Sequence, residues 1–325
     1  MARSAHAKFA HVLRLLALMA VATISLPGAT PAADAPRVFV ARAERILMPE
    51  HVLAPEFIYP QGKIDYPVVA GLLDQAMMNL TGERSGKEAW CSRVTPLDRV
   101  GIMLDIEPLP VHRALLEAVT LRLIACGVPR ENTIVFAAEE SALFRAGFDL
   151  SEVPGRVRVM GADSEGYRRG MTRVVLDYCT VIINLSRLRM DARIGMSGAI
   201  ANHLAATPTV ERLRLLSHPE ELAAVAARGS LKLKTRLHIM DALRPGDLPT
   251  DHADPETWLY RGVLVSEDPV ALDAVAREIL LARLRESKPD AAALTPPVVY
   301  LEPAATRYRL GVADLDAIDL TEIGP

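Results

Sequence analysis

The amino-acid sequence predicts a three-layer α/β domain around a largely parallel sheet, with a small helical insertion. Short β-branched and apolar runs alternate along the chain with longer segments of helical periodicity, a pattern typical of a sheet covered by helices on both faces. The clearest unit is 99–138, where a strand, a turn with prolines, a helix ended by Gly127 and a second strand follow one another. This order indicates a βαβ motif.

The other elements are justified by their residues. The segment 66–80 has apolar residues at helical spacing behind Asp65, and 269–285 begins with Pro269 behind Asp268; aspartate is a common N-cap and proline is tolerated in the first turn. A short helix carries Asn202 and His203, the insertion covers 207–228, and another short helix lies at Ala304. The remaining strands are predicted at 37–41, 156–160, 181–183, 236–243, 262–266 and 298–301, the remaining helices at 111–126 and 141–146.

The N-terminus has the pattern of a secretory signal peptide at residues 1–33. Three cations, Arg3, Lys8 and Arg14, lie before or at the start of an apolar run, 13–26, and a tail of small residues follows. We therefore expect cleavage near Ala32 or Ala33 and a periplasmic or secreted protein. The apolar run is too short for a bilayer, which predicts no stable membrane span after cleavage. An uncleaved anchor or a misassigned start codon is the alternative. Residues 34–325 are predicted to form one domain, with its core at about 94–323.

Charge argues against a nucleic-acid partner. The chain has 37 Lys and Arg and 40 Asp and Glu, and removal of the three cations of the signal leaves about −6. Without global basicity or interleaved aromatic residues, we expect no nucleic-acid binding. Any site for an anion must therefore be local.

Three cysteines, Cys91, Cys126 and Cys179, have no C-x-x-C spacing, which excludes an internal ferredoxin-type cluster. In an oxidising compartment Cys91 is the first candidate for a disulfide with one of the others. The favoured interpretation of Cys126 and Cys179 is that they are buried free thiols.

Polar residues follow four predicted strands, and in a parallel sheet such ends meet at one edge, where ligands bind. Arginines there suit a carboxylate or phosphate, whereas the acids with Asn184 suit a divalent metal. The sequence names neither a cofactor nor a metal. The four groups are Asp105 with Glu107, Glu139 with Glu140, Asn184 with Arg187 and Arg189, and Asp241 with Arg244. The candidate ligand-binding residues are Asn184, Arg187, Arg189, Gly195, Gly198, Asn202, Asp241 and Asp268.

Structural explanations compete with the functional ones. Strand ends are solvated anyway, Gly195 to Gly198 suits a tight turn better than a phosphate loop, and Asp268 is a helix cap. His238 suits a buried structural histidine, and Ser197 lacks the context of a nucleophile. These alternatives stay open on the sequence alone.

Several of these segments resemble the domain of unknown function 362 family. The residues 182–185, the basic pair Arg187 and Arg189, and the run 195–204 resemble its pattern I-N-L-P-K-L-K-T-H, then G-x-(S/T)-G-A-x-K-N. The segment 238–241 resembles a family strand that ends in aspartate, and 262–273 resembles G-x-(I/L)-(I/V)-x-S-x-D-P-V-A-x-D. With the segments 99–102 and 310–311, the resemblance covers roughly 94–323.

The chain departs from that pattern where the family carries cations. Arg187 and Arg189 replace two lysines of the family pattern, and Met190-Asp191 replaces its threonine–histidine pair. Ala201 replaces the lysine before the asparagine. Arginine keeps the charge but does not shuttle protons as an amine does. The ferredoxin-like cysteine clusters of many relatives are not present in this sequence.

Two functional hypotheses follow, and neither specifies a reaction or a protein partner. The first is a periplasmic or secreted protein that binds a small anionic ligand or a metal at the strand-end cleft. The second is a catalytically degenerate accessory module for a periplasmic partner. An iron–sulfur-associated redox role is the weakest alternative.

Overall fold

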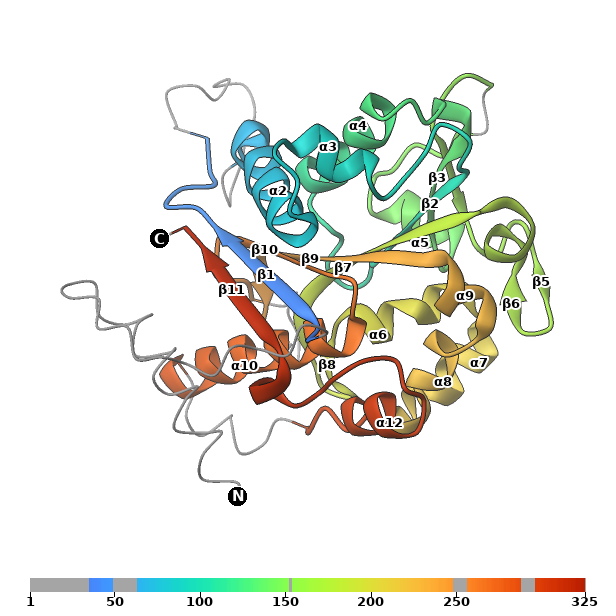
Figure 1. Ribbon diagram of the computed structural model, residues 1–325. Coiled ribbons are helices and arrows are strands. Elements are labelled where there is room, and N and C mark those ends of the chain that lie inside the picture. The colour runs from blue at the N-terminus through green and yellow to red at the C-terminus, as the bar shows by residue number, and fades with distance from the viewer. Residues whose placement is uncertain (1–34, 49–62, 152–153, 248–255, 288–295, 325) are drawn as a thin grey trace.

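The computed structural model describes residues 35–48, 63–151, 154–247, 256–287 and 296–324, so the predicted signal peptide lies outside the described residues. Its centre is a nine-stranded, mostly parallel sheet (Figure 1). The strands are β1 (Arg37–Arg42), β2 (Val100–Leu104), β3 (Thr133–Ala137), β4 (Arg158–Gly161), β7 (Val181–Asp191), β8 (Gly195–Ser197), β9 (Thr235–Gly246), β10 (Gly262–Ser266) and β11 (Asp319–Ile323). Their order is β11-β1-β10-β9-β7-β2-β3-β4, β8 pairs with β7, and β5 (Tyr167–Arg168) and β6 (Met171–Thr172) form a separate hairpin.

Helices cover both faces of this sheet and confirm the predicted three layers (Figure 1). One face packs against α2 (Tyr66–Thr81), α3 (Gly86–Cys91), α4 (Arg113–Ala125) and α5 (Glu140–Arg145). The other packs against α6 (Ala199–Asn202), α7 (Thr209–Leu216), α8 (Ala223–Ala226), α9 (Gly229–Lys234), α10 (Pro269–Ser287) and α12 (Leu301–Thr306). Short 3-10 segments lie at Arg130–Asn132, His203–Ala206, Pro219–Glu221 and Leu315–Ala317, and a π-helical turn at Val174–Tyr178. None of the helices within the described ranges is long and apolar enough to cross a bilayer.

Strand direction decides which residues meet at the sheet edge. The strands β9, β7, β2, β3 and β4 are parallel to one another, and β2, α4 and β3 form the predicted βαβ unit. Strand β10 is antiparallel to β9 and β1. The residue after β10 therefore lies at the opposite edge from the residues that follow β2, β3 and β7.

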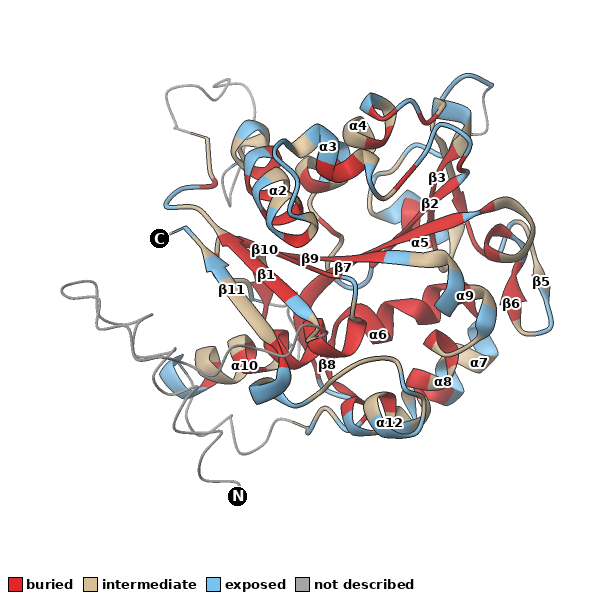
Figure 2. Cartoon of the chain, viewed as in Figure 1, coloured by how far each residue is buried: buried red, intermediate tan, exposed pale blue. Residues whose placement is uncertain are grey.

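The strand β7 is longer than predicted. It continues from Val181 to Asp191, is buried throughout (Figure 2), and pairs with β2 on one side and β9 on the other. Arg187 and Arg189 therefore lie inside the strand, because pairing with β9 continues past the apolar run. Strand β9 likewise extends to Gly246, beyond the predicted end at 243.

Two further local predictions were wrong. Gly195 to Ser197 forms β8, which folds back antiparallel onto β7, so this segment is a hairpin strand rather than a turn that opens the helix. The segment 298–301 is not a strand: a turn closes from the Val299 N–H to the Pro297 carbonyl, and α12 begins at Leu301. Its apolar residues are explained by packing instead, because Tyr300 is fully buried beneath the sheet.

Cys91 and Cys126 form a disulfide that joins the end of α3 to the end of α4, with their Cα atoms 5.2 Å apart. The prediction that Cys126 is a free thiol is wrong, because α3 packs beside α4 and brings Cys91 to it. Cys179 is free and buried, and burial raises the pKa of its thiol to about 12. It is therefore an unreactive core residue.

Reduction of this disulfide is expected to lower the free energy of unfolding by about 2–4 kcal/mol, because a cross-link restricts the unfolded chain. Urea unfolding with and without dithiothreitol measures the change. The Cys91→Ser/Cys126→Ser variant should unfold like the reduced protein and ignore dithiothreitol, whereas Cys179→Ala should keep the response. A wild-type protein that dithiothreitol does not destabilise would contradict this expectation.

Candidate functional site

A cleft opens where β2, β3 and β7 end, and it has two adjoining chambers. The outer chamber, about 710 Å³, lies between the loop after β2, α5 and the β7–β8 turn. The inner chamber, about 310 Å³, continues toward α6 and α7. Both are lined by Ile106, Glu107, Ala142, Arg189, Asp191 and Arg193. Pro108, Pro110 and Arg145 also line the outer chamber. The inner chamber has further polar groups: Asp105, Glu139, Ser197, Asn202, Thr209 and Arg212.

Arg189 is the buried cation between the two chambers. Its guanidinium lies 3.3 Å from the Asp105 carboxylate and 3.4 Å from that of Asp191, and donates to the Glu107 carbonyl at 2.6 Å. Burial raises the pKa of Asp191, but the Arg193 N–H and the neighbouring guanidinium groups outweigh it and hold that pKa below its ordinary value. Arg189 is thus a structural cation that two buried carboxylates neutralise.

Two other arginines of the outer chamber are more available. The side chains of Arg145 and Arg193 are each 58% exposed. Arg145 pairs with Glu107, and Arg193 lies 3.4 Å from Asp191. A guanidinium has five N–H donors, so most donors of both groups face solvent. Deeper in, Arg212 on α7 pairs with Glu139, whose carboxylate also accepts from Thr209 at 3.1 Å.

Asn184 and Asn202 connect the inner chamber to the sheet. The Asn202 Nδ2 donates to the Met103 and Leu185 carbonyls, at 3.1 and 3.3 Å, and to Asn184 Oδ1 at 2.6 Å. Asn184 lies beneath, fully buried, and its Nδ2 donates to the Ala199 carbonyl at 2.7 Å. These two amides therefore fix α6 against β2 and β7.

The two histidines next to Asn184 are neutral structural residues, as predicted for His238. Burial lowers the pKa of His203 to about 4 and that of His238 well below its ordinary value. His203 Nδ1 lies 2.8 Å from the Ala199 carbonyl, so this nitrogen carries the proton. His238 Nδ1 lies 3.1 Å from Asn184 Nδ2 and accepts from it.

Gly195 and Gly198 shape the hairpin rather than line the cleft. Gly195 has a φ of +82°, and a Cβ there would lie 2.5 Å from the Pro296 carbonyl oxygen. A Cβ on Gly198 would lie 2.3 Å from the Asp273 carboxylate, which caps α6 by accepting from the Ala199 and Ile200 N–H groups at 2.6 and 3.0 Å. Glycine is therefore required by close approach at both positions.

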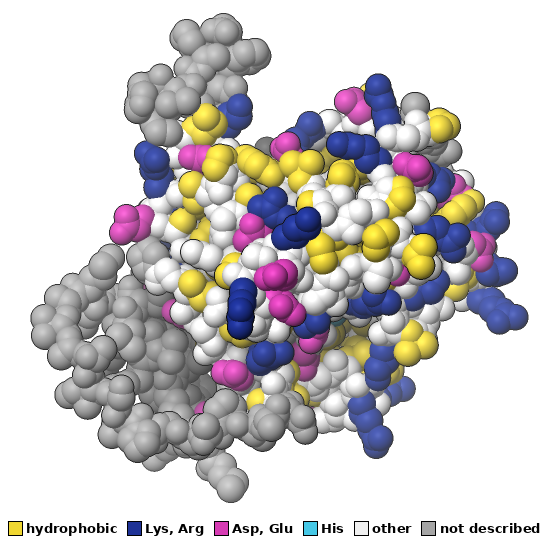
Figure 3. Space-filling view, turned by 45° about the horizontal axis from the view of Figure 1, so that its top comes forward, with side chains coloured by type: hydrophobic (Ala, Val, Ile, Leu, Met, Phe, Trp, Pro, Cys, Tyr) yellow, Lys and Arg dark blue, Asp and Glu magenta, His cyan; other side chains and the backbone are white. Residues whose placement is uncertain are grey.

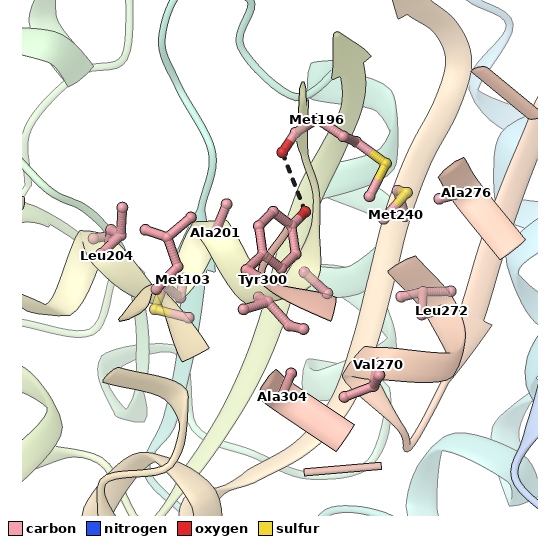
Figure 4. Packing of buried hydrophobic residues seen from close by; sticks show 14 of the residues in the cluster. Met103, Met196, Ala201, Leu204, Met240, Val270, Leu272, Ala276, Tyr300 and Ala304 are labelled. Atoms are coloured by element: carbon pink, nitrogen blue, oxygen red, sulfur yellow. Dashed lines mark hydrogen bonds between the residues drawn. The ribbon is translucent and has the colours of Figure 1, made fainter. Parts of the chain in front are cut away.

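Asp273 and Tyr300 hold α6 from below. The Tyr300 hydroxyl donates to the Met196 carbonyl at 3.1 Å (Figure 4) and lies 3.4 Å from the Asp273 carboxylate. Burial raises the pKa of Asp273 to about 7, against the opposing effect of the N–H groups of Ile200 and Ala199. Figure 4 shows Tyr300 among Met103, Ala201 and Leu204 in the same layer.

Arg187 and Asp241 support the loop that forms the floor of the outer chamber. They are neighbours in the β7–β9 register. Arg187 donates to the Pro110 carbonyl and, at 2.8 Å, to the Arg244 carbonyl. Asp241 is fully buried and accepts from the His112 backbone N–H and its ring Nδ1, both at 2.7 Å. These contacts hold the loop at Pro110 and His112.

Asp268 lies at the opposite edge of the sheet, because β10 is antiparallel. One carboxylate oxygen accepts from the Val270 and Ala271 N–H groups at 2.8 Å, and the other from the Val312 N–H at 3.0 Å. Asp268 is therefore the predicted cap of α10, and the structure does not bring it to the cleft.

Of the eight residues chosen from the sequence, Arg189 and Asn202 line the cleft. Asn184 lies behind Asn202 and accepts a hydrogen bond from it. Arg145, Arg193, Asp191 and Ser197 are lining residues that were not chosen. Arg193 follows the basic pair Arg187 and Arg189 in the sequence as a third cation, whereas Arg145 reaches the site from a helix and no local motif marks it. Across the ranges that the structure describes, no group of three or more His, Cys, Asp or Glu side chains is placed to hold a metal ion.

Comparison with known families agrees with the motifs. Residues 142–278 match the model of the Domain of unknown function (DUF362), a shorter span than the resemblance at 94–323 but one that includes β7, β8, α6, β9 and β10. No curated protein matches the chain. Residues 142–278 are therefore a DUF362 domain, and the resemblance that the motifs indicated is confirmed.

Proposed function

We propose that this protein binds a small anionic ligand in the outer chamber, between Arg145 and Arg193. The proposal rests on one observation: two half-exposed guanidinium groups line the same chamber. Each guanidinium group pairs with one carboxylate and keeps other donors for a ligand. Guanidinium groups recognise carboxylate and phosphate oxygens in pairs, so a carboxylate or a phosphate suits this position.

The charges around the outer chamber balance. Three arginines, Arg145, Arg189 and Arg193, face Glu107 and Asp191 in its lining, and Asp105 pairs with Arg189 from the inner chamber. The exposed donors of Arg145 and Arg193, rather than a net positive charge, therefore support an anion. Figure 3 shows charged side chains of both signs interspersed over one face of the molecule.

Binding is proposed rather than lysine-dependent chemistry. At the position of the family lysine that precedes the asparagine, this chain has Ala201, which lines the inner chamber. The amine that could shuttle a proton there is replaced by a methyl group. The accessory module remains the second candidate, and the same substitution favours it.

We also propose that the protein works in the periplasm or outside the cell. The signal-like pattern of residues 1–33 supports this location. The disulfide between Cys91 and Cys126 supports it as well, since such bonds persist in oxidising compartments.

Calorimetric titration with acetate and with inorganic phosphate tests the ligand proposal. The Arg193→Gln and Arg145→Gln variants should each bind the preferred anion at least about tenfold more weakly, because a charge-assisted hydrogen bond contributes about 1.5–3 kcal/mol. Arg214→Gln is the matched control: Arg214 is also half-exposed in one ion pair, with Glu221, but lies outside the cleft. Wild-type protein that binds neither anion, or an Arg193→Gln variant that binds as wild type does, would sink the proposal.

A further inference from the structure

The inner chamber presents a hydrogen-bond acceptor that nothing in the described chain satisfies. The Asn202 amide lies beside three atoms that can only accept hydrogen bonds: the Met103 carbonyl, the Leu185 carbonyl and Asn184 Oδ1. They fix its orientation, with Nδ2 toward the sheet. Its Oδ1 makes no hydrogen bond within the described ranges and is not fully enclosed. Asn202 is 6% exposed and lines the inner chamber, so Oδ1 is the part of the amide turned toward it.

Two further polar groups of the inner chamber present acceptors. Asp105 is a buried carboxylate whose Oδ2 accepts from the Ser197 hydroxyl at 3.2 Å. The Ser197 hydroxyl uses its single hydrogen in this bond, so it offers only lone pairs to a ligand. The donors of this chamber are on its arginines: Arg212 pairs with Glu139, and Arg189 and Arg193 also line the outer chamber. Asn202, Asp105 and Ser197 therefore offer acceptors to the donor of a ligand.

We infer that the ligand of this cleft is bifunctional, with an anionic group in the outer chamber and a hydroxyl or primary ammonium group in the inner chamber. The inference rests on the proposed anion site. Arg189 and Arg193 line both chambers, so one small molecule can reach both. A donor beside Asn202 satisfies an Oδ1 that otherwise depends on water, and an unmet buried acceptor is costly. An anion without the donor gains only the outer contacts.

Matched straight-chain acids with three to five carbons test this inference. For each length, the unsubstituted acid, the ω-hydroxy acid and the ω-amino acid are titrated into the full-length mature protein by calorimetry. The ω-substituted acid of the fitting length should bind at least about tenfold more tightly than its unsubstituted counterpart. The tighter of the hydroxy and amino forms identifies the donor.

Two variants assign the preference to the inner chamber. Asp105→Asn, nearly isosteric, should weaken binding of the ω-amino acid more than that of the unsubstituted acid. Ala201→Lys places a donor of the protein in the chamber and should remove the preference for the ω-substituted acid while binding of the unsubstituted acid remains. Circular dichroism verifies that each variant is folded, and the wild-type comparison stands without either.

The outcomes separate this inference from the proposed function. If unsubstituted acids bind as tightly as their ω-substituted counterparts at every length, the inner-chamber inference is wrong and the anion site stands. If neither these acids nor inorganic phosphate bind, the proposed function is wrong and the inference falls with it.

Discussion

Replacement of Arg189 by methionine is expected to lower the free energy of unfolding by about 3–5 kcal/mol, the cost of breaking a buried charge pair by removing one partner. The variant leaves the carboxylates of Asp105 and Asp191 buried without the cation that lies 3.3 and 3.4 Å from them. It also leaves the Glu107 carbonyl without its donor. Equilibrium urea unfolding at neutral pH measures the loss.

A matched arginine four residues away controls for the loss of charge. Arg193→Met should change stability by less than about 1 kcal/mol, because an exposed ion pair contributes little, although it should weaken binding of the anion. Adding Asp105→Asn and Asp191→Asn to the Arg189→Met protein should recover part of the stability, since the stranded charges are gone. Equal stability of the Arg189→Met and Arg193→Met proteins would contradict the role assigned to Arg189.

Asp241→Asn is expected to have an effect of similar size, about 3–5 kcal/mol at neutral pH. Asp241 faces Arg187 across the β7–β9 register and accepts two hydrogen bonds from His112. Burial alone raises the pKa of Asp241, but His112 and Arg187 outweigh it and lower that pKa to about 2. The neutral amide loses these electrostatic partners and removes the carboxylate that acts most strongly on the buried Arg187 guanidinium.

The pH dependence of this loss has a defined sign. A carboxyl whose folded-state pKa lies below its unfolded value stabilises the protein above the unfolded pKa, and this contribution disappears as the pH falls through the folded pKa. The gap in stability between wild type and Asp241→Asn should therefore be constant above about pH 5 and shrink by about 2 kcal/mol toward pH 2. Asp149→Asn, at an exposed position, should give no such change. A gap that widens with acidity would refute the assignment.

The sequence predicted the sheet edge where the cleft lies because that prediction needs only the order of strands and helices. Once β2, β3 and β7 are parallel, Asp105, Glu107 and Glu139 must converge with the end of β7. Individual side chains were harder to assign. The apolar run stops at Ile183, but pairing with β9 extends β7 to Asp191, and that depends on a strand about fifty residues further along the chain.

Asp268 and Arg145 show why single side chains were hard to assign. Asp268 was chosen from the sequence but lies away from the cleft, and Arg145 lines the cleft but was not chosen. Asp268 follows a strand and precedes a helix, as a ligand-binding residue would, but the direction of β10 is set by its neighbours and not by its own residues. Arg145 lies on a short helix without any motif and reaches the cleft only because α5 packs beside the loop after β2. Strand direction and helix packing depend on tertiary structure, so local sequence patterns do not predict them.

The cap on α6 ties the cleft to a part of the chain that does not line it. Asp273 and Tyr300 hold the turn that carries Asn202, although they follow it by about 70 and 100 residues. As the chain leaves the ribosome from its N-terminus, every lining residue emerges before either of these supports. The cleft is therefore completed last, and Tyr300 lies beyond the DUF362 match that ends at residue 278. A fragment cut to the borders of that match would lack the tyrosine on which the cleft depends.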